Sequence, residues 1–449
     1  MSETVRFAPS PTGEIHIGNV RTALYNWFLT RDGGTFVLRY DDTDPERSKA
    51  HFAALIAEDL AWLGIHPHRV ERQSARLARY DAVADDLRAR GLLYPCYETP
   101  EELERKRALQ RARGRPPVYD RSALALTDQD RRRIEGEGRR PHYRFRLPGG
   151  ARAWEDRCRG PQSVDLATLS DPILVREDGS YPYTLPSVVD DVDFAVTVVV
   201  RGEDHVTNTA VQIALFEALG AQPPAFAHHN LLVRADGEPL SKRDNPLSIA
   251  RLRAAGYEPM AVASLAALVG TSEPVRAVPD LPALAEAVPL SAVSRGPATF
   301  DPAELDRLNA SLLHAMPFEA VREWLEGETG EADPVFWEAV RGNLALRRDA
   351  LDWHRVIRTP PAQGAPAGPE DRAVLEAARA SLPPEPWDET TFRSWTEAVR
   401  GATGRKGRAL FMPLRVALTG RGSGPEMGPI IALLGREAVA DRLDRALSA

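Results

Sequence analysis

SPTGEIHIGN occupies residues 10–19, between a short run of strand-forming residues and the start of a predicted helix. Prolines in and just before this stretch fix backbone torsions, while Gly13 and Gly18 leave room for a ligand to approach the main chain. The N-terminus of a helix that follows a strand favours phosphate, because its free N–H groups and its dipole attract negative charge. The stretch therefore predicts a nucleotide site, in which His16 donates hydrogen bonds to phosphate oxygens. An isolated His-x-Gly would more simply be an exposed turn, but the full ten-residue string favours the nucleotide site.

The residues on either side of this stretch predict an α/β fold. Apolar residues recur at helical spacing from Asn19 until Gly33-Gly34 ends the helix, and a strand-like run follows at residues 35–40. Further helices are predicted at about 48–63 and 74–90. Strands and helices that alternate in this order are typical of a parallel sheet.

The composition and the predicted secondary structure change twice along the rest of the chain. Arginine-rich helices and short extended runs at about 96–179 predict an α+β insertion, after which the α/β pattern resumes with the strand Val196–Val200. The chain after about Gly256 is predicted to be entirely helical. We therefore expect an α/β, Rossmann-like parallel-sheet catalytic domain with an α+β insertion, followed by all-α domains. The predicted boundaries are 1–95 and 181–255 for the two catalytic halves, 96–180 for the insertion, and 256–315 and 316–449 for the helical domains.

Composition and charge exclude some classes of protein. Hydrophobic residues make up 43% and charged residues 27% of the 449-residue chain, which is ordinary for a globular protein. No run of about 18 apolar residues predicts a membrane span, and residues 1–13 predict no secretory signal. Two cysteines, Cys96 and Cys158, favour a reducing compartment, and we expect the cytoplasm. The net charge of −7 does not decide nucleic-acid binding, because arginines are clustered at 105–115 and 131–140.

A second motif reads Pro239-Leu240-Ser241-Lys242-Arg243. It is predicted to lie in a loop after the second α/β half. A loop that carries Lys and Arg can close over a triphosphate and stabilise charge on the departing pyrophosphate. Ser-Lys-Arg alone is common, so the evidence that this motif is functional is its position in the chain after the first motif.

The two motifs together resemble the signatures of class I aminoacyl-tRNA synthetases. Residues 10–19 resemble the HIGH signature in the form used by the glutamate and glutamine enzymes, with Asn19 in place of the final histidine. Residues 239–243 resemble the KMSKS loop of the glutamate family; Pro239 replaces its first lysine, and Lys242 matches the decisive second one. The resemblance extends from about residue 4 to residue 447 and points to the glutamyl-tRNA synthetases of the bacterial type. The proline puts the dynamics of the loop and its affinity for ATP in question.

The resemblance implies an ATP-dependent ligase that forms glutamyl-adenylate and then transfers the glutamyl group to the 3′-terminal adenosine of tRNA. Enzymes of this family typically need bound tRNA before they activate glutamate. Mg²⁺ would accompany ATP. The residues implied to bind ATP are Ser10, Thr12, His16, Gly18, Asn19 and Lys242. Catalytic roles are implied for His16, Gly18, Ser241, Lys242 and Arg243.

The resemblance also implies a glutamate site formed by Arg6, Ser10, Asp41, Tyr183 and Arg201. Asp41 would pair with the substrate α-ammonium, and Arg201 would bind the side-chain carboxylate. The place of Arg201 at the end of a valine-rich strand supports its role independently, because such sheets bind ligands at the carboxyl ends of strands. An arginine after a strand is otherwise an ordinary surface charge.

Some bacterial glutamyl enzymes hold zinc in the insertion through a Cys-x-Cys pair and a later Cys or His. The corresponding stretch here reads Cys96-Tyr97-Glu98, and no Cys or His follows near residues 119–121. Because a structural zinc needs four close ligands, we predict no structural zinc and no other metal site.

The predicted partners are tRNA, glutamate and ATP. The arginines of the insertion are expected to hold the tRNA acceptor end, and the segments 300–305, 411–420 and 430–437 resemble helical stem-contact and anticodon-binding domains. The basic groups Arg347-Arg348 and 405–408 are candidates for tRNA contacts, with ordinary surface charge as the open alternative. The resemblance implies tRNA(Glu) as acceptor and leaves tRNA(Gln) open. We expect a monomer that does not bind membranes.

Three other functions would explain part of this sequence. A short paralogue that glutamylates a modified tRNA base lacks an anticodon-binding domain, and glutaminyl enzymes carry β-barrel anticodon domains. The helical tail argues against both. A non-catalytic tRNA-binding or regulatory protein is suggested by Pro239, but the intact His16, Gly18 and Lys242 argue against loss of activity.

Overall fold

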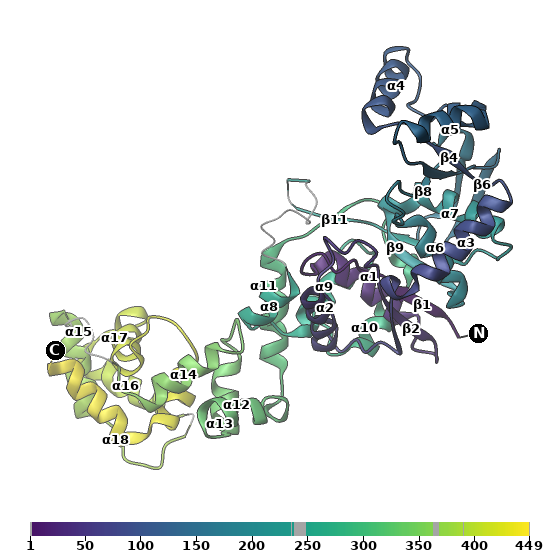
Figure 1. Cartoon of the computed structure of the whole chain (residues 1–449). Helices are drawn as coiled ribbons and strands as arrows, with labels where there is room; N and C mark the ends of the chain where they lie inside the picture. The colour runs from purple at the N-terminus through teal and green to yellow at the C-terminus, as the bar shows by residue number, and fades with distance from the viewer. Residues whose placement is uncertain (1, 235, 238–247, 362–367, 389, 449) are drawn as a thin grey trace. The chain divides into compact units, whose positions relative to one another are not determined.

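The computed structural model of the chain describes residues 2–234, 236–237, 248–361, 368–388 and 390–448 (Figure 1). The chain forms two compact units. The first comprises Met1–Ala254 and Val262–Asp301, and the second comprises Ala255–Ala261 and Pro302–Ala449. The chain thus enters the second unit briefly, returns to the first, and ends in the second.

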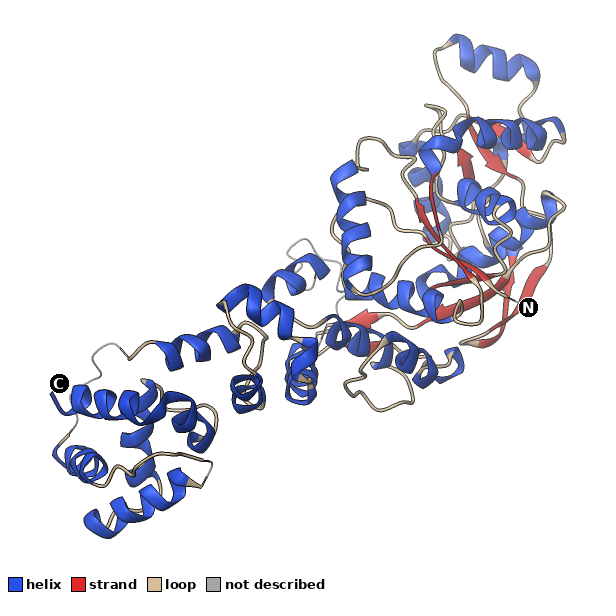
Figure 2. Cartoon of the chain, turned by 90° about the horizontal axis from the view of Figure 1, so that it is seen from below, coloured by secondary structure: helices blue, strands red, loops and turns tan. Residues whose placement is uncertain are grey.

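A seven-stranded sheet forms the centre of the first unit, in the order β3-β2-β1-β9-β10-β6-β7 (Figure 2). Neighbouring strands are parallel from β3 to β6, and only the last pair, β6 with β7, is antiparallel. The strand order reverses between β1 and β9, which is where sheets of this kind open a crevice at their carboxyl ends. The bounds are β1 Thr4–Phe7, β2 Thr35–Tyr40, β3 Arg69–Arg72, β6 Ala151–Asp156, β7 Gly160–Asp165, β9 Val198–Gly202 and β10 Ala225–His229.

Helices cover the central strands. The apolar run Val198–Val200 of β9 is buried throughout, as expected for a parallel strand covered on both faces. Helix α1 packs on β1 and β9, and helix α7 packs on β6. The bounds of the helices between residues 17 and 287, outside the insertion, are α1 Ile17–Phe28, α2 Ala50–Trp62, α3 Leu77–Ala89, α6 Thr184–Asp193, α7 Val206–Ala218, α8 Ile249–Ala255, α9 Pro259–Leu268 and α10 Leu281–Ala287.

The range predicted as an insertion contributes to two sheets. Strands β4 Leu93–Cys96, β5 His142–Phe145 and β8 Ile173–Val175 form an antiparallel sheet of their own, which carries helices α4 Pro100–Ala112 and α5 Asp128–Gly136. The hairpin β6–β7 instead joins the main sheet next to β10. Part of the insertion is therefore continuous with the sheet that forms the crevice.

The second unit is built from helices around one apolar core. Trp337 and Trp395 are almost completely buried in it, and each indole N–H donates to a backbone carbonyl. Helix α18 bends at Gly435, whose φ of +75° is a conformation that glycine adopts readily. The bounds are α11 Pro302–Ala315, α12 Arg322–Thr329, α13 Pro334–Arg341, α14 Asp349–Arg358, α15 Pro369–Ala380, α16 Thr391–Thr403, α17 Arg408–Thr419 and α18 Met427–Ser448.

The predicted α/β class with a helical tail is confirmed. The range after residue 256 is not entirely helical as predicted, because β12 Ala298–Thr299 pairs with β11 Leu232–Val233. A two-residue strand carries no periodicity that a sequence could reveal. Among the described residues, no helix is both long enough and apolar enough to cross a bilayer.

Candidate active site

His16 is the N-cap residue of α1. The Gly18 N–H donates to His16 Nδ1 at 3.1 Å, and the His16 N–H donates to Asn19 Oδ1 at 3.0 Å. Because Nδ1 accepts a hydrogen bond, the imidazole proton is assigned to Nε2. Burial lowers the pKa of His16, which keeps the ring neutral. His16 therefore offers a neutral N–H donor beside the N–H groups at the start of a helix.

Gly18 makes room for the His16 ring. A Cβ atom added at Gly18 would lie 3.0 Å from His16 Cε1 and 3.1 Å from His16 Nδ1. Those distances are shorter than ordinary contacts, so with a side chain here the imidazole would have to shift by a few tenths of an ångström. The glycine therefore leaves room for the histidine ring as well as the open space that the sequence predicted for a ligand.

A cavity of about 580 Å³ opens at the carboxyl ends of β1, β9 and β10. Its size is in the range of small-molecule and cofactor sites. Six of the residues predicted to bind substrates line it: Arg6, His16, Gly18, Asn19, Tyr183 and Arg201. One cavity thus brings together residues from both halves of the catalytic domain, some predicted to bind ATP and others predicted to bind glutamate.

Arg201 is buried in the wall of this cavity and is held by three neighbours. Its Nε–H donates to His228 Nε2 at 3.2 Å, its Nη1 to the Tyr183 hydroxyl at 3.2 Å, and its Nη2 to Thr209 Oγ1 at 2.7 Å. These three bonds use three of the five guanidinium N–H donors. Two donors are left for a ligand, and a planar carboxylate can accept both.

Arg6 brings a second cation to the same cavity. Its Nε–H donates to Asp191 Oδ1 at 3.2 Å, so this arginine has a direct carboxylate partner. Burial raises the pKa of the Tyr183 hydroxyl, but the charges of Arg201 and Arg6 outweigh burial and lower it. The cavity wall is therefore electropositive where the two arginines lie, which suits an anionic ligand.

Three predicted ligands lie outside the cavity lining. Ser10 and Thr12 are exposed residues of the loop between β1 and α1. Asp41 follows β2, and both of its carboxylate oxygens accept hydrogen bonds from Arg39, at 2.8 and 3.3 Å. Their predicted contacts with substrate stay predictions.

Ser241, Lys242 and Arg243, together with Pro239, lie outside the described residues. The described chain on either side does approach the cavity. Val233 lines the cavity before the gap. After the gap, Ser248 pairs with His16, and the Ile249 N–H donates to the Ile15 carbonyl at 3.0 Å. The described residues on both sides of the second motif therefore lie close to the first motif or to the cavity.

Sequence reasoning missed the residues that hold the two arginines. Asp191, which accepts from Arg6, stands in the acidic pair Asp190-Asp191 shortly after Tyr183, so the charge pattern offered a signal. His228 and Asp156, which lie behind Arg201, offered none. They are 72 residues apart in the chain and meet only because β6 and β10 are neighbours in the sheet.

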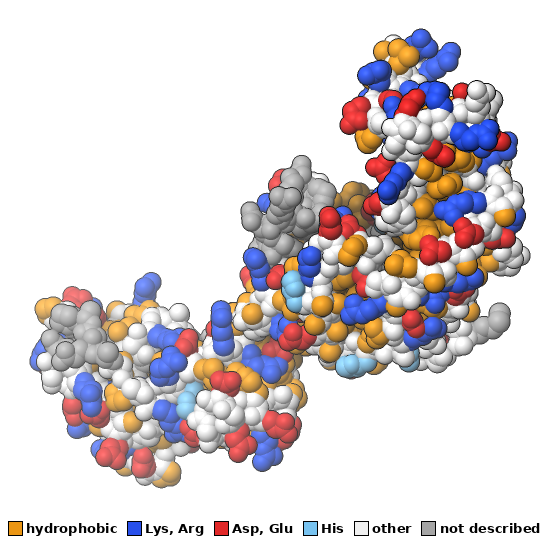
Figure 3. Space-filling model, in the orientation of Figure 1, with side chains coloured by type: hydrophobic (Ala, Val, Ile, Leu, Met, Phe, Trp, Pro, Cys, Tyr) orange, Lys and Arg blue, Asp and Glu red, His pale blue; other side chains and the backbone are white. Residues whose placement is uncertain are grey.

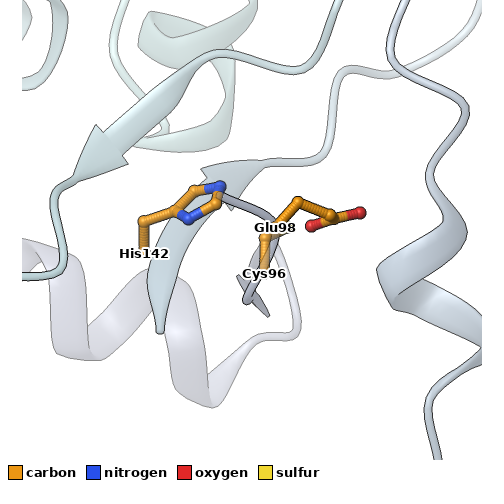
Figure 4. A group of neighbouring side chains, drawn as sticks. All are labelled: Cys96, Glu98 and His142. Atoms are coloured by element: carbon orange, nitrogen blue, oxygen red, sulfur yellow. The ribbon is translucent and has the colours of Figure 1, made fainter. Parts of the chain in front are cut away.

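The insertion brings together three groups that could ligate a metal, Cys96, Glu98 and His142 (Figure 4). One ligand atom from each lies within 4.8 Å of the others, and His142 Nε2 is buried without a hydrogen-bond partner among the described residues. The sequence prediction missed His142, which comes from β5. Burial raises the pKa of the Cys96 thiol to about 11 and lowers that of His142 to about 4.

Other side chains already contact the ligand atoms of this group. The Tyr119 hydroxyl lies 3.6 Å from Cys96 Sγ and donates to Glu98 Oε1 at 2.8 Å. The Lys106 ammonium lies 3.3 Å from the same Glu98 oxygen. A structural zinc takes four ligands, and an ammonium repels a cation. Three ligands beside a lysine do not fit a structural zinc.

The basic residues of the insertion differ in whether they have partners. Arg107 and Arg111 on α4 pair with Glu104, and Arg139 pairs with Glu102. Lys and Arg side chains gather at the tip of the insertion over α4 (Figure 3). Within the described residues, the insertion carries seven exposed arginines that have no carboxylate within 4.0 Å: Arg105, Arg113, Arg115, Arg132, Arg140, Arg146 and Arg176. These arginines are available to a polyanion.

Comparison with known families matches two parts of the chain. Residues 3–307 match the family of tRNA synthetases class I (E and Q), catalytic domain. Residues 362–447 match the family described as anticodon binding domain.

Curated relatives match nearly the whole chain. It is 59% identical to glutamate–tRNA ligase 2 of Methylobacterium sp. (strain 4-46), over 99% of each chain. It is 56% identical to glutamate–tRNA ligase 1 of Brucella canis, over 98% of this chain and 100% of the relative.

Solved structures share the fold. The crystal structure of a glutamate tRNA ligase from Elizabethkingia meningosepticum, in complex with its amino acid, superimposes with a TM-score of 0.85 at 24% identity, and covers 100% of this chain and 99% of the other. A glutamate-tRNA synthetase from Elizabethkingia anophelis superimposes with a TM-score of 0.83, also at 24% identity and over 100% of both chains.

Proposed function

This chain belongs to the glutamate–tRNA ligases, within the class I tRNA synthetases for glutamate and glutamine, and we propose that it attaches glutamate to tRNA(Glu) at the expense of ATP. The α-carboxylate of glutamate attacks the α-phosphorus of ATP, which forms glutamyl-adenylate and releases pyrophosphate. The 2′-hydroxyl of the terminal adenosine of tRNA then takes the glutamyl group and releases AMP. The observation that carries the proposal is the single cavity that joins the His16 helix start to the buried Arg201.

The ATP end of the cavity is the start of α1. His16 Nε2–H is a neutral donor for a phosphate oxygen, and Gly18 and Asn19 line the cavity beside it. Ser10 and Thr12 on the preceding loop complete the proposed ATP contacts. Charge that develops on the phosphates is stabilised by donors already in place, which needs no reorganisation during the reaction.

The second motif supplies positive charge for the departing pyrophosphate. We assign this role to Lys242, supported by Ser241 and Arg243. The described residues around the motif favour the assignment, because Ser248 pairs with His16 and Val233 lines the cavity. ATP would enter as its magnesium complex.

The glutamate end of the cavity is formed by cations. Arg201 has two free N–H donors for the side-chain carboxylate, and Arg6 and Tyr183 stand beside it. Asp41 is assigned to the α-ammonium group, together with Ser10. No residue needs to form a covalent bond, because the reaction follows from positioning both substrates and stabilising phosphate charge.

The tRNA is proposed to lie on exposed arginines. The exposed arginines of the insertion that have no carboxylate partner suit the acceptor end, and the match of residues 362–447 to anticodon-binding domains suits the other end of the tRNA. Each arginine that neutralises a phosphate releases counterions, so binding should weaken steeply with salt.

The protein is proposed to act as a monomer in the cytoplasm, without a structural zinc. The absence of zinc is supported by the contacts that Tyr119 and Lys106 make with the Cys96–Glu98–His142 group. Elemental analysis of the purified protein checks this point: stoichiometric zinc that resists dialysis would contradict it.

The deciding experiment measures pyrophosphate release from ATP with glutamate, with and without purified tRNA. We expect release that depends on both glutamate and tRNA and that is lost in His16→Ala. Absence of release from a protein that still binds tRNA would exclude the ligase. Charging purified tRNA(Glu) and tRNA(Gln) side by side then shows whether the second tRNA is also an acceptor.

A further inference from the structure

Arg201 is held from behind by a pair of buried side chains on neighbouring strands. Strand β10 pairs with β9 in a register that sets His228 opposite Arg201, and Asp156 ends β6 on the other side of β10. The Arg201 Nε–H donates to His228 Nε2 at 3.2 Å, and His228 Nδ1 lies 2.5 Å from Asp156 Oδ2. The side chains of His228 and Asp156 have no exposed surface. A chain of hydrogen bonds thus leads from the cavity wall to a carboxylate inside the sheet.

The protonation of this pair follows from its partners. Arginine nitrogen can only donate, so His228 Nε2 accepts and the imidazole proton lies on Nδ1, where it is donated to Asp156. Burial lowers the pKa of His228 and keeps the ring neutral. Burial raises the pKa of Asp156, but hydrogen bonds from His228 outweigh it and lower the pKa to about 2. The negative charge of Asp156 is therefore separated from Arg201 by the His228 side chain.

This arrangement differs from that of Arg6, which contacts the Asp191 carboxylate directly. Within the described part of the chain, no carboxylate lies within 4.0 Å of the Arg201 guanidinium. A carboxylate in direct contact would occupy the donors of Arg201 and cancel its charge locally. The neutral His228 imidazole fixes the Arg201 side chain. It leaves the positive charge of Arg201 and two of the Arg201 N–H groups available to the cavity.

We propose that Asp156 and His228 are positioning residues that fix the orientation of Arg201 and reserve its charge for the substrate, and thereby set the preference for anionic glutamate over neutral glutamine. The proposal rests on the proposed function, in which Arg201 binds the glutamate side chain. It makes β6, a strand of the insertion, part of the apparatus that selects the amino acid.

Asp156→Asn tests the proposal by replacing one carboxylate oxygen with an NH₂ group. Asp156 Oδ1 accepts the backbone N–H groups of Cys158, Arg159 and His228 at 3.0–3.1 Å. The carbonyl oxygen of asparagine must keep that place, so its NH₂ group faces His228 Nδ1. The imidazole must then carry its proton on Nε2, where it meets the Nε–H of Arg201. Two donors then face each other: the His228 N–H turns to Thr209 Oγ1, 2.9 Å away, and the Arg201 Nε–H loses its acceptor.

Charging rates are measured with purified tRNA, first at saturating ATP while glutamate or glutamine is varied, and then at saturating glutamate while ATP is varied. In Asp156→Asn we expect the KM for glutamate to rise roughly tenfold or more, as for a lost hydrogen bond to a charged group, with the KM for ATP within about twofold of the parent. The ratio of kcat/KM for glutamate over glutamine should fall by a similar factor. Glu155→Gln removes the same charge at an exposed neighbouring position of β6 and should match the parent.

Arg201→Lys separates this proposal from the function on which it rests. A raised glutamate KM in Arg201→Lys with an unchanged one in Asp156→Asn would overturn the positioning role and leave the ligase assignment intact. An unchanged glutamate KM in Arg201→Lys would overturn the role of Arg201 itself. Equal increases in the KM values for ATP and glutamate in Asp156→Asn would show a merely structural role and would also overturn the proposal.

His228 provides a second pair of variants, compared by their thermal unfolding to confirm folding. His228→Gln retains an oxygen that can accept from Arg201 Nε, whereas His228→Leu has a similar size and no acceptor. We expect the glutamine variant to keep a glutamate KM several-fold lower than the leucine variant. Equal KM values in the two folded variants would contradict the need for an acceptor at this position.

Discussion

Arg39 holds both carboxylate oxygens of Asp41, with Nε 2.8 Å from Oδ1 and Nη2 3.3 Å from Oδ2. Arg39 is fully buried, and its Nη1 also donates to Asp191 Oδ1 at 2.8 Å. The same Asp191 oxygen accepts from Arg6. One network of charges thus connects the residue assigned to the substrate α-ammonium with an arginine of the cavity wall.

Asp41→Asn should affect both substrate binding and stability. We expect the KM for glutamate to rise about tenfold, because the α-ammonium loses its charged partner, and the free energy of unfolding to fall by about 1–3 kcal/mol, because Arg39 keeps fewer carboxylates. Charging kinetics and urea unfolding measure the two effects. Asp44→Asn, at an exposed position on the same loop, is the control. Lost stability with an unchanged glutamate KM would show that Asp41 serves only Arg39.

Asp59 should make the stability of the first unit depend on pH. It is fully buried on α2, where Arg253 Nη2 lies 3.3 Å from one of its oxygens, and burial raises its pKa from 3.8 to about 6. A raised pKa in the folded state means that the stabilising contribution is complete below pH 3.8 and is lost as the pH rises through about 6. At pH 7.5 the ionised carboxylate then costs up to about 3 kcal/mol.

Asp59→Asn should therefore be more stable than the parent at pH 7.5, and this advantage should shrink as the pH falls from 7 to 5. Urea unfolding over this pH range measures the difference, with Glu286→Gln, at an exposed position of α10 in the same unit, as the control. A difference that stays constant with pH would show that Asp59 does not titrate in this range.

Arg347 and Arg348 are adjacent but should differ in role. The Arg347 Nε–H donates to Glu258 Oε1 at 2.7 Å, and its guanidinium lies over the Trp324 ring, whereas Arg348 is exposed. Arg348→Ala should weaken tRNA binding and lower the slope of log affinity against log salt by about 0.7–0.9, as for one lost phosphate contact. Arg347→Ala should instead lower the free energy of unfolding by about 1–3 kcal/mol, because the buried Glu258 loses its partner.

Salt-dependent tRNA binding and urea unfolding of both variants distinguish these roles. A smaller salt slope in Arg347→Ala and an unchanged slope in Arg348→Ala would reverse the assignment. Unchanged slopes in both would mean that neither arginine meets the tRNA backbone.

Lys242→Ala tests the second motif. We expect kcat for glutamate-dependent pyrophosphate release to fall by about 100-fold or more while the KM for glutamate changes little, because the lysine acts on charge that develops at the phosphates. Rates with and without tRNA are compared with those of the parent protein. An unchanged kcat would refute the assigned role.

The sequence by itself determined the class of fold, the two motifs and the family. These features are local: the spacing of apolar residues records a helix or a strand, and SPTGEIHIGN records a strand end, a turn and a helix start. His16, Gly18 and Asn19 could therefore be assigned before any coordinates, and the helical tail could be separated from the α/β part. Arg201 was assigned from the resemblance to the family, and its place at the end of a valine-rich run supported the assignment independently.

Only the tertiary structure decided which side chains hold those residues in place. Asp156 and His228 lie behind Arg201 because β6 and β10 are neighbours in the sheet, and His142 lies beside Cys96 because β5 pairs with β4. Strand order and register set these contacts, and neither leaves a periodic trace in the chain, because the partners come from segments whose spacing in sequence is arbitrary.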